Sequence, residues 1–158
     1  MASSLNQLSL KGRALRLLSG REHSRAELEK RLAEHESAPG ELAAMLDELQ
    51  AKGFISEQRV VESVIHRKAG KLGAARIRQE LNAKGLDREM VAEAVAGLQA
   101  SELARARALW QGKFGTGGEA TTTDPKAKAR QMRFLAARGF GGETIRRVMQ
   151  APADGLAD

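Results

Sequence analysis

The sequence contains no cysteine and no tyrosine, and only one tryptophan, four phenylalanines and three prolines in 158 residues. Without cysteine the chain can form no disulfide, thiolate nucleophile or sulfur-ligated zinc site, which fits a reducing compartment. No run approaches the roughly 20 apolar residues that span a bilayer, and the N-terminal stretch MASSLNQLSLKGR has no apolar region like that of a secretory signal. We therefore expect a cytoplasmic protein that does not enter a membrane.

Residue patterns typical of enzymes are also missing. His23, His35 and His66 show no HxxxH spacing and no neighbouring ligands for a metal, and we expect His23 and His35 to be surface residues. The glycines between residues 115 and 118 follow a helical pattern instead of a strand, and no GKS or GKT comes after them, so they do not form a phosphate-binding loop. The sequence predicts a non-catalytic protein without metal or cofactor.

One phrase occurs three times along the chain. It reads AELEKRLAEHE from Ala26, ARIRQELNAKGLD from Ala75 and ARQMRFLAARGFG from Ala129. A repeat of roughly 50 residues indicates a tandem architecture, in which each unit packs only on its neighbours. Aligning the copies places two sets of residues in equivalent columns: Leu28, Ile77 and Gln131, and then Leu32, Leu81 and Leu135.

Each copy predicts three helical segments, about nine in the chain, because apolar residues recur with helical spacing and no segment alternates like a strand. The third segments show this most clearly, with apolar residues at i, i+3, i+4 and i+7: Leu42, Met45, Leu46 and Leu49 in the first copy, and Val91, Ala94, Val95 and Leu98 in the second. We predict an all-α fold of three tandem three-helix units, elongated and able to curve. The expected boundaries are a flexible N-terminus (1–8), units at 9–55, 56–99 and 100–150, a mobile loop (115–124) in the third unit, and a frayed tail (151–158).

Residues that start and stop helices support these units. Ser24 with Glu27 predicts a capping box, and Asp124 before Pro125 predicts another helix start. Three glycines after helical stretches predict left-handed C-caps, each followed by an apolar residue expected to pack against the helix. These pairs are Gly53 with Phe54, Gly85 with Leu86, and Gly139 with Phe140.

The net charge of +6 is unevenly distributed. Residues 1–50 carry 7 Lys and Arg against 8 Asp and Glu, whereas residues 51–158 carry 19 against 12. Clustered guanidinium groups suit bidentate contacts to phosphates or carboxylates, so the basic region predicts an anionic partner, although part of it serves only solvation or weak internal pairs. The candidate binding residues are Arg76, Arg78, Lys84, Arg88, Lys126, Lys128, Arg130, Arg133, Arg138, Arg146 and Arg147.

The stretch QELNAKGLDREMVAEAV also has the outline of a helix-turn-helix. Its second helix offers Arg88 to base edges, but Asp87, Glu89 and Glu93 accompany it. With so few aromatic residues, the chain also lacks a platform for stacking single-stranded bases. Any contact with DNA is therefore expected to be electrostatic, salt-dependent and not sequence-specific.

Three stretches together resemble the RecX family of regulators of the RecA recombinase: RALRLLSGREHSRAELEKRL (13–32), RQELNAKGLD (78–87) and ARQMRFLAARGFGGETIRRVM (129–149). The resemblance runs from about Leu10 to Gln150. It implies an elongated monomer of three three-helix units that lies in the groove of the RecA–DNA filament, inhibits ATP hydrolysis and strand exchange, and acts in recombination, DNA repair and the SOS response. The basic positions that match the family are Arg76, Arg78, Lys84, Arg130, Arg133 and Arg138.

Two alternative functions remain open from the residues alone. A general DNA-binding module of tandem helix-turn-helix type would bind DNA with a steep salt dependence and without any recombinase. A protein-only adaptor would pair its arginines with acidic side chains and would not bind DNA at physiological salt.

Overall fold

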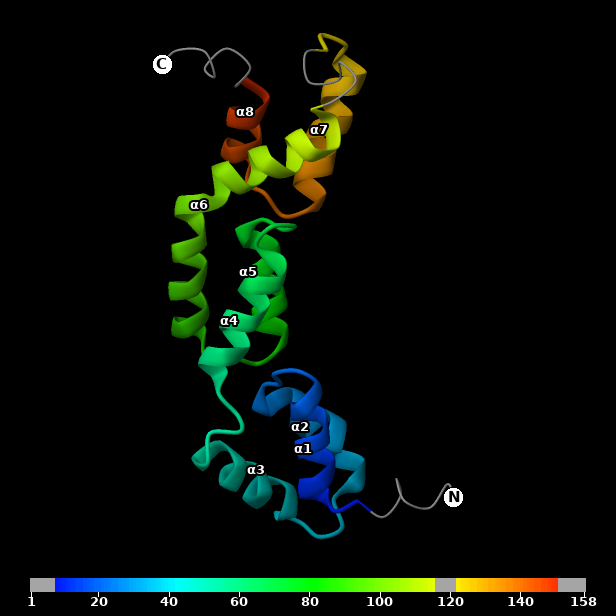
Figure 1. Ribbon diagram of the computed structural model, residues 1–158, viewed down its shortest axis with the longest axis vertical. Helices are drawn as coiled ribbons and strands as arrows, with labels where there is room; N and C mark the ends of the chain where they lie inside the picture. The colour runs from blue at the N-terminus through cyan, green and yellow to red at the C-terminus, as the bar shows by residue number, and fades with distance from the viewer. Residues whose placement is uncertain (1–7, 116–121, 151–158) are drawn as a thin grey trace.

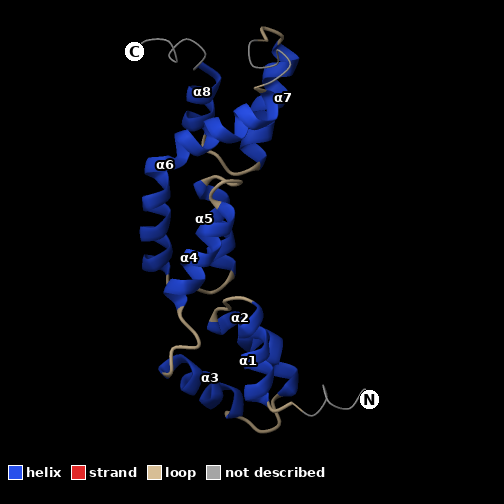
Figure 2. Cartoon of the chain, in the orientation of Figure 1, coloured by secondary structure: helices blue, strands red, loops and turns tan. Residues whose placement is uncertain are grey.

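The computed structural model describes residues 8–115 and 122–150, and within them it contains eight α-helices, one short 3₁₀ helix and no strand (Figures 1 and 2). The predicted all-α fold is confirmed. The predicted flexible N-terminus, the centre of the predicted loop and the predicted tail lie outside the described residues. In chain order the elements are α1 (Leu10–Gly20), α2 (Arg25–Leu32), η1 (Ala33–His35), α3 (Glu41–Ala51), α4 (Glu57–Lys68), α5 (Ala74–Ala83), α6 (Arg88–Phe114), α7 (Pro125–Ala137) and α8 (Gly142–Gln150).

The buried apolar side chains form three separate clusters, one for each repeated unit. This is the packing expected of a tandem array, in which no single core runs through the chain. The first cluster is centred on Leu28, Leu46 and Leu49, the second on Ile77, Leu81 and Val95, and the third on Leu135, Trp110 and Val148.

The longest helix belongs to two of these units. Residues predicted to form two helices, one ending near Leu98 and one beginning near Leu103, form the single helix α6 of 27 residues. The connecting residues, AGLQASELA, contain no proline and only one glycine, so nothing interrupts the backbone hydrogen bonds. Figure 1 shows α6 bending part-way along its length, so that its two parts pack in different units.

The predicted helix starts are present. Ser24 Oγ accepts a hydrogen bond from the Glu27 N–H, and Glu27 Oε1 accepts one from the Ser24 N–H, both at 3.1 Å, which completes the capping box. Asp124 caps α7, and Pro125 is its first residue, where the missing N–H costs nothing.

The predicted helix ends are also present, with one correction. Gly53, Gly85 and Gly139 all have positive φ, between 69° and 89°, which only glycine adopts at little cost. Leu86 and Phe140 are buried behind their glycines as expected. Phe54 is 47% exposed, and Ile55 is buried in its place, because the chain leaves α3 one residue further on before it turns back to the core.

The second helices of the three units follow one another end to end. Between units one and two, Ser24 Oγ at the start of α2 donates a hydrogen bond of 2.6 Å to the Lys84 carbonyl at the end of α5. Between units two and three, the Gly73 N–H at the start of α5 donates a bond of 2.8 Å to the Arg138 carbonyl at the end of α7. The same joint thus occurs twice. In each joint the C-terminal carbonyls of one helix lie beside the N-terminus of another, so the negative end of one helix dipole faces the positive end of the other.

The joint between units two and three is further held by buried Glu102 of α6. Its Oε1 accepts a hydrogen bond of 3.1 Å from the Ala74 N–H, and its Oε2 accepts one of 3.0 Å from Thr144 Oγ1. Since Gly73 has no side chain with which to cap α5, the carboxylate of Glu102 takes that role. Repeated joints of this kind produce the elongated molecule in Figure 1, with unit one and unit three at opposite ends.

Candidate functional site

The candidate basic surface is most continuous on α7. Lys126, Arg130 and Arg133 are exposed and spaced i, i+4 and i+7, so they lie along one stripe of the helix, which we call the α7 stripe. The opposite face of α7 is buried through Ala127, Gln131 and Leu135. The sequence pattern therefore places the stripe on the solvent side. Lys128 is exposed on another flank, beside the exposed Met132.

The end of α7 carries a partly buried cation. The Arg138 guanidinium lies over the Phe134 ring, 4.3 Å from its centroid, and Lys113 lies 5.5 Å from the same centroid. Both cations gain from the electron-rich ring face. Arg138 Nε is buried without a hydrogen-bond partner, and its backbone carbonyl belongs to the joint with unit two. Arg138 therefore stabilises the fold in addition to contributing a positive charge.

The predicted basic residues of α5 do not lie together. Arg76 and Arg78 lie on different flanks of the helix because two residues correspond to more than half a turn. Arg76 Nη1 donates to the Ala137 carbonyl at 3.1 Å, and Lys84 Nζ pairs with Glu27 at 3.3 Å. Arg76 and Lys84 thus contribute to the two joints, whereas Arg78 extends into solvent without an ion pair in the described residues.

The remaining predicted residues lie on α6 and α8. Arg88 is exposed at the first turn of α6. On α8, Arg146 Nη2 and Arg147 Nε both bind Glu143 Oε1, at 2.5 and 3.0 Å. Hydrogen bonds from Arg146 and then Arg147 lower the pKa of the Glu143 carboxyl. One carboxylate therefore already neutralises part of the charge of this pair.

His23 corrects a sequence-based expectation. It is 2% exposed instead of lying on the surface, because it stands between α1 and the cap of α2, with Nδ1 3.0 Å from the Arg21 carbonyl. Burial lowers the pKa of its imidazole. Arg105 is a second partly buried group that the sequence did not single out: it donates to the Ala69 and Leu72 carbonyls at 2.7 and 2.8 Å, and burial lowers the pKa of its guanidinium.

The described residues contain no cluster of His, Asp and Glu that could hold a metal ion. None of the helices in this part of the chain is long and apolar enough to cross a membrane.

Three family models match the chain in order. They are the first RecX three-helix domain at residues 11–49, the second at 56–95 and the third at 100–149. Curated relatives are similar over nearly their whole length. The regulatory protein RecX of Leptothrix cholodnii is 51% identical over 150 residues, covering 95% of this chain and 93% of the relative. The regulatory protein RecX of Ralstonia nicotianae is 45% identical over 158 residues, covering 100% of this chain and 96% of the relative.

Solved structures agree at the level of the fold. The crystal structure of RecX from Lactobacillus salivarius superimposes with a TM-score of 0.75 at 18% identity, covering 95% of this chain and 97% of that one. A second RecX crystal structure gives a TM-score of 0.73 at 17% identity, covering 89% of this chain and 71% of that one. Three tandem three-helix domains, the relatives and the shared fold together show that the chain belongs to the RecX family of regulatory proteins.

Proposed function

We propose that this chain is a non-catalytic modulator of RecA, which binds as a monomer in the groove of the RecA–DNA filament and inhibits its ATPase and strand-exchange activities in recombination and the SOS response. The observation that carries the proposal is the combination of an elongated three-unit array with the α7 stripe on its solvent side. Membership of the RecX family is consistent with regulation of RecA. Its site of action would be the cytoplasm.

Binding would depend on several weak contacts along the array. The α7 stripe, Arg78 and Arg88 expose cations in units three and two, and each contact with a phosphate or carboxylate is screened by salt. A filament presents its subunits and its DNA at regular intervals, so contacts made by the linked units of one molecule add through a high effective concentration. Free RecA offers only one of these positions and would bind less tightly.

DNA contacts of this kind would not read sequence. Arg88 is the exposed cation nearest the turn of the helix-turn-helix outline, but Asp87 caps α6 beside it, and Glu89 and Glu93 are exposed on the same helix. Carboxylates repel the phosphates that flank a groove. The arrangement favours general electrostatic attraction over recognition of bases.

The test compares affinities for RecA–DNA filament, monomeric RecA and bare DNA at the same salt concentration. Arg130→Glu with Arg133→Glu reverses two charges of the α7 stripe, and Arg67→Glu with Lys71→Glu makes the same change in charge at exposed positions near the end of α4. We expect the first pair of substitutions to weaken filament binding by about tenfold or more, and the control pair by about twofold or less.

The outcomes separate the proposal from its alternatives. Loss of both filament and DNA binding in the stripe variant indicates phosphate contacts, whereas loss of filament binding alone indicates contacts with RecA. Equal affinity of the unaltered chain for monomeric RecA and for filament would contradict the proposal. DNA binding that is indifferent to RecA would instead support a general DNA-binding module.

A further inference from the structure

A groove of about 1570 Å³ runs between unit one and the end of α5, at the opposite end of the molecule from α7 (Figure 1). Its walls carry four cations that the predicted basic region did not include. Arg13 and Arg16 are one helical turn apart on α1, and Lys30 and Arg31 lie next to each other on α2. None of the four makes an ion pair or side-chain hydrogen bond in the described part of the chain.

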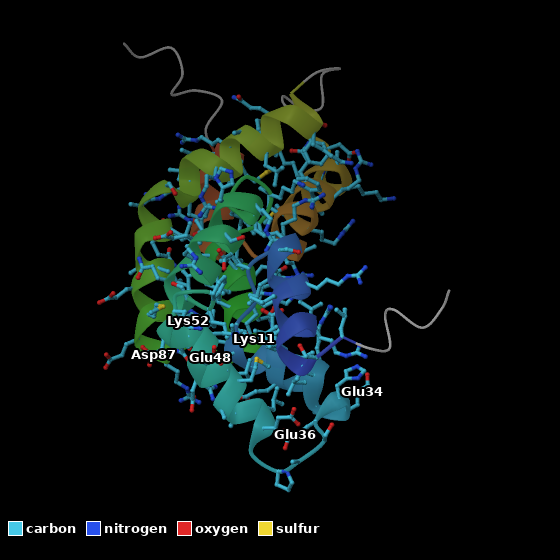
Figure 3. The ribbon with its side chains drawn as sticks, turned by 60° about the horizontal axis from the view of Figure 1, so that its bottom comes forward. Lys11, Glu34, Glu36, Glu48, Lys52 and Asp87 are labelled. Atoms are coloured by element: carbon cyan, nitrogen blue, oxygen red, sulfur yellow. The ribbon has the colours of Figure 1, made fainter. Side chains whose placement is uncertain are left out.

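These cations stay unpaired because the acidic residues of unit one bind other groups. Figure 3 shows Glu48 beside Lys11 and Lys52, whose Nζ atoms lie 2.7 and 2.8 Å from its Oε1. Each of the eight acidic residues of residues 1–50 lies against a cationic side chain, the His35 imidazole or a backbone N–H group. Glu22 pairs with Arg59, Glu27 with Arg21 and Lys84, and Glu29 and Asp47 with Arg25. Glu34 lies 3.4 Å from His35 Nε2, an ion pair only when that imidazole is protonated, and Glu36 and Glu41 accept backbone N–H groups.

The groove is not uniformly positive. Glu27, Glu34 and Glu80 also line it. Burial alone would raise the pKa of Glu27, but hydrogen bonds from Ser24 and Arg21, together with Lys84, lower it to about 2, so this carboxylate stays ionised near neutral pH. Glu80, on the α5 wall, has no ion pair in the described residues.

Apolar side chains lie among these charges. Leu17 on α1 and Leu32 on α2 line the groove, and Leu8, an exposed large apolar side chain, lines it as well. Neither phenylalanine nor tryptophan lines it, and the one aromatic ring among the lining residues is that of His35. A nucleic acid strand would find only the His35 ring beside Glu34, and no row of aromatic side chains on which to stack successive bases. Its continuous phosphates would also meet the three carboxylates. An amphipathic helix instead presents carboxylates at selected positions and leucine-like side chains at i, i+3, i+4 and i+7.

We propose that this groove, which we call the α1–α2 groove, is a docking site for an acidic amphipathic segment of a partner protein. The carboxylates of the segment would pair with Arg13, Arg16, Lys30 and Arg31, and its apolar face would cover Leu17 and Leu8. The site is separate from the α7 stripe, so the molecule would hold two anionic partners at its two ends. This inference does not depend on the proposed action on RecA.

The experiment measures fluorescence anisotropy of a labelled peptide titrated with the full chain. The probe is an amphipathic peptide of about fourteen residues, with Leu at i, i+3, i+4 and i+7 and Glu at most other positions. A scrambled peptide of the same composition and a labelled oligo(dT) strand serve as comparison ligands. Arg13→Glu with Arg16→Glu alters the groove, and Arg67→Glu with Lys71→Glu is the matched change in charge outside it.

A second variant should strengthen peptide binding, in contrast to the charge reversal at Arg13 and Arg16. Glu80 is a groove carboxylate that makes no ion pair in the described residues, and Glu80→Lys puts a cation in its place. We expect it to tighten peptide binding by about threefold to tenfold, whereas the Arg13 and Arg16 pair of substitutions weakens binding by about tenfold. The circular dichroism of each variant should match that of the unaltered chain, since none of the three residues makes a side-chain hydrogen bond in the described residues.

Three results would overturn the proposal. Equal losses in the groove variant and its matched control would mean that peptide affinity follows net charge alone. Equal binding of the scrambled peptide would remove the role of the apolar face. Loss of oligo(dT) binding in the groove variant, with peptide binding unchanged, would assign the groove to nucleic acid. Selective weakening by Arg13→Glu with Arg16→Glu and tightening by Glu80→Lys would support it.

Discussion

Replacing Gly139 by alanine should break the joint between units two and three. Gly139 has φ +89°, and a Cβ built on it would overlap the Cβ of Arg76 and lie 2.7 Å from the Arg76 backbone nitrogen. Gly53 provides a matched control, because it also follows a helix with φ +82° but has no atom within 4 Å of the same Cβ position. Both substitutions impose the same backbone strain, and only Gly139→Ala also forces the joint apart.

The expected magnitudes follow from this difference. An alanine in the left-handed region costs about 1 to 2 kcal/mol, which is the whole effect expected for Gly53→Ala. Gly139→Ala adds displacement of packed backbone and the loss of the neighbouring bond from the Gly73 N–H to the Arg138 carbonyl, together about 2 kcal/mol more. We therefore expect a total loss near 3 to 4 kcal/mol.

Urea unfolding followed by circular dichroism measures both losses, with the midpoint and slope fitted for each variant. Gly73→Ala gives an independent check, since Gly73 has φ −78° and thus little backbone strain, yet its Cβ would overlap the Gly139 carbonyl. Equal losses for Gly139→Ala and Gly53→Ala, or an unaffected Gly73→Ala variant, would refute the steric account of the joint.

Three further predictions concern buried polar groups. Glu102→Ala removes the acceptor of the Ala74 N–H at the start of α5 and should cost about 2 to 3 kcal/mol in urea unfolding; a loss below about 0.5 kcal/mol would contradict the capping role. Because burial lowers the pKa of His23 below 6.5 in the folded chain, the unfolded chain binds more protons and stability should fall as the pH decreases from about 7 to about 5; this pH dependence should flatten in His23→Gln, and an unchanged slope would contradict it. Gln131→Leu should cost about 1 to 2 kcal/mol despite the apolar residues at the equivalent positions of the other units, because the Trp110 Nε1–H loses its acceptor at 2.9 Å; a stabilised variant in thermal unfolding would contradict this.

The local elements of the fold could be predicted because their causes are local. Helical spacing, the Ser24 capping box and the glycines with positive φ depend on residues within a few positions of one another. The repeated phrase also aligned Gln131 with buried positions of the other units, and Gln131 is indeed 1% exposed. The alignment of the repeats thus indicated that Gln131 is buried, whereas its polar side chain considered alone would predict exposure.

Two of the features that escaped prediction, the burial of His23 and the close approach at Gly139, depend on contacts between distant residues, whereas the continuity of α6 does not. The two helical patterns join into the single helix α6 because no proline or other helix-breaking residue separates them. Hydrophobic periodicity indicates each helical segment but not whether the residues between two segments are also helical. His23 is buried by packing between α1 and α2, which its neighbours in sequence do not reveal. Gly139 was predicted as a helix end, but its close approach to the backbone at Gly73 appears only in three dimensions.

The α1–α2 groove escaped prediction for an electrostatic reason. The net charge of residues 1–50 is close to neutral, which indicated no binding surface. In the folded chain the acidic residues of this segment bind other groups, so Arg13, Arg16, Lys30 and Arg31 remain without ion pairs along one groove. The net charge of a segment does not reveal a cluster of cations whenever the compensating carboxylates bind other groups.

The most direct test of the proposed action on RecA is the single-stranded-DNA-dependent ATPase rate of the cognate RecA, titrated with this protein at near-physiological salt. The protein alone and the Arg130→Glu with Arg133→Glu variant serve as controls. Suppression of the rate at substoichiometric protein, weakened in the variant, is the predicted result and indicates action on the assembled filament. An unchanged rate with DNA binding intact would contradict the account and leave a DNA-binding module with the RecX fold.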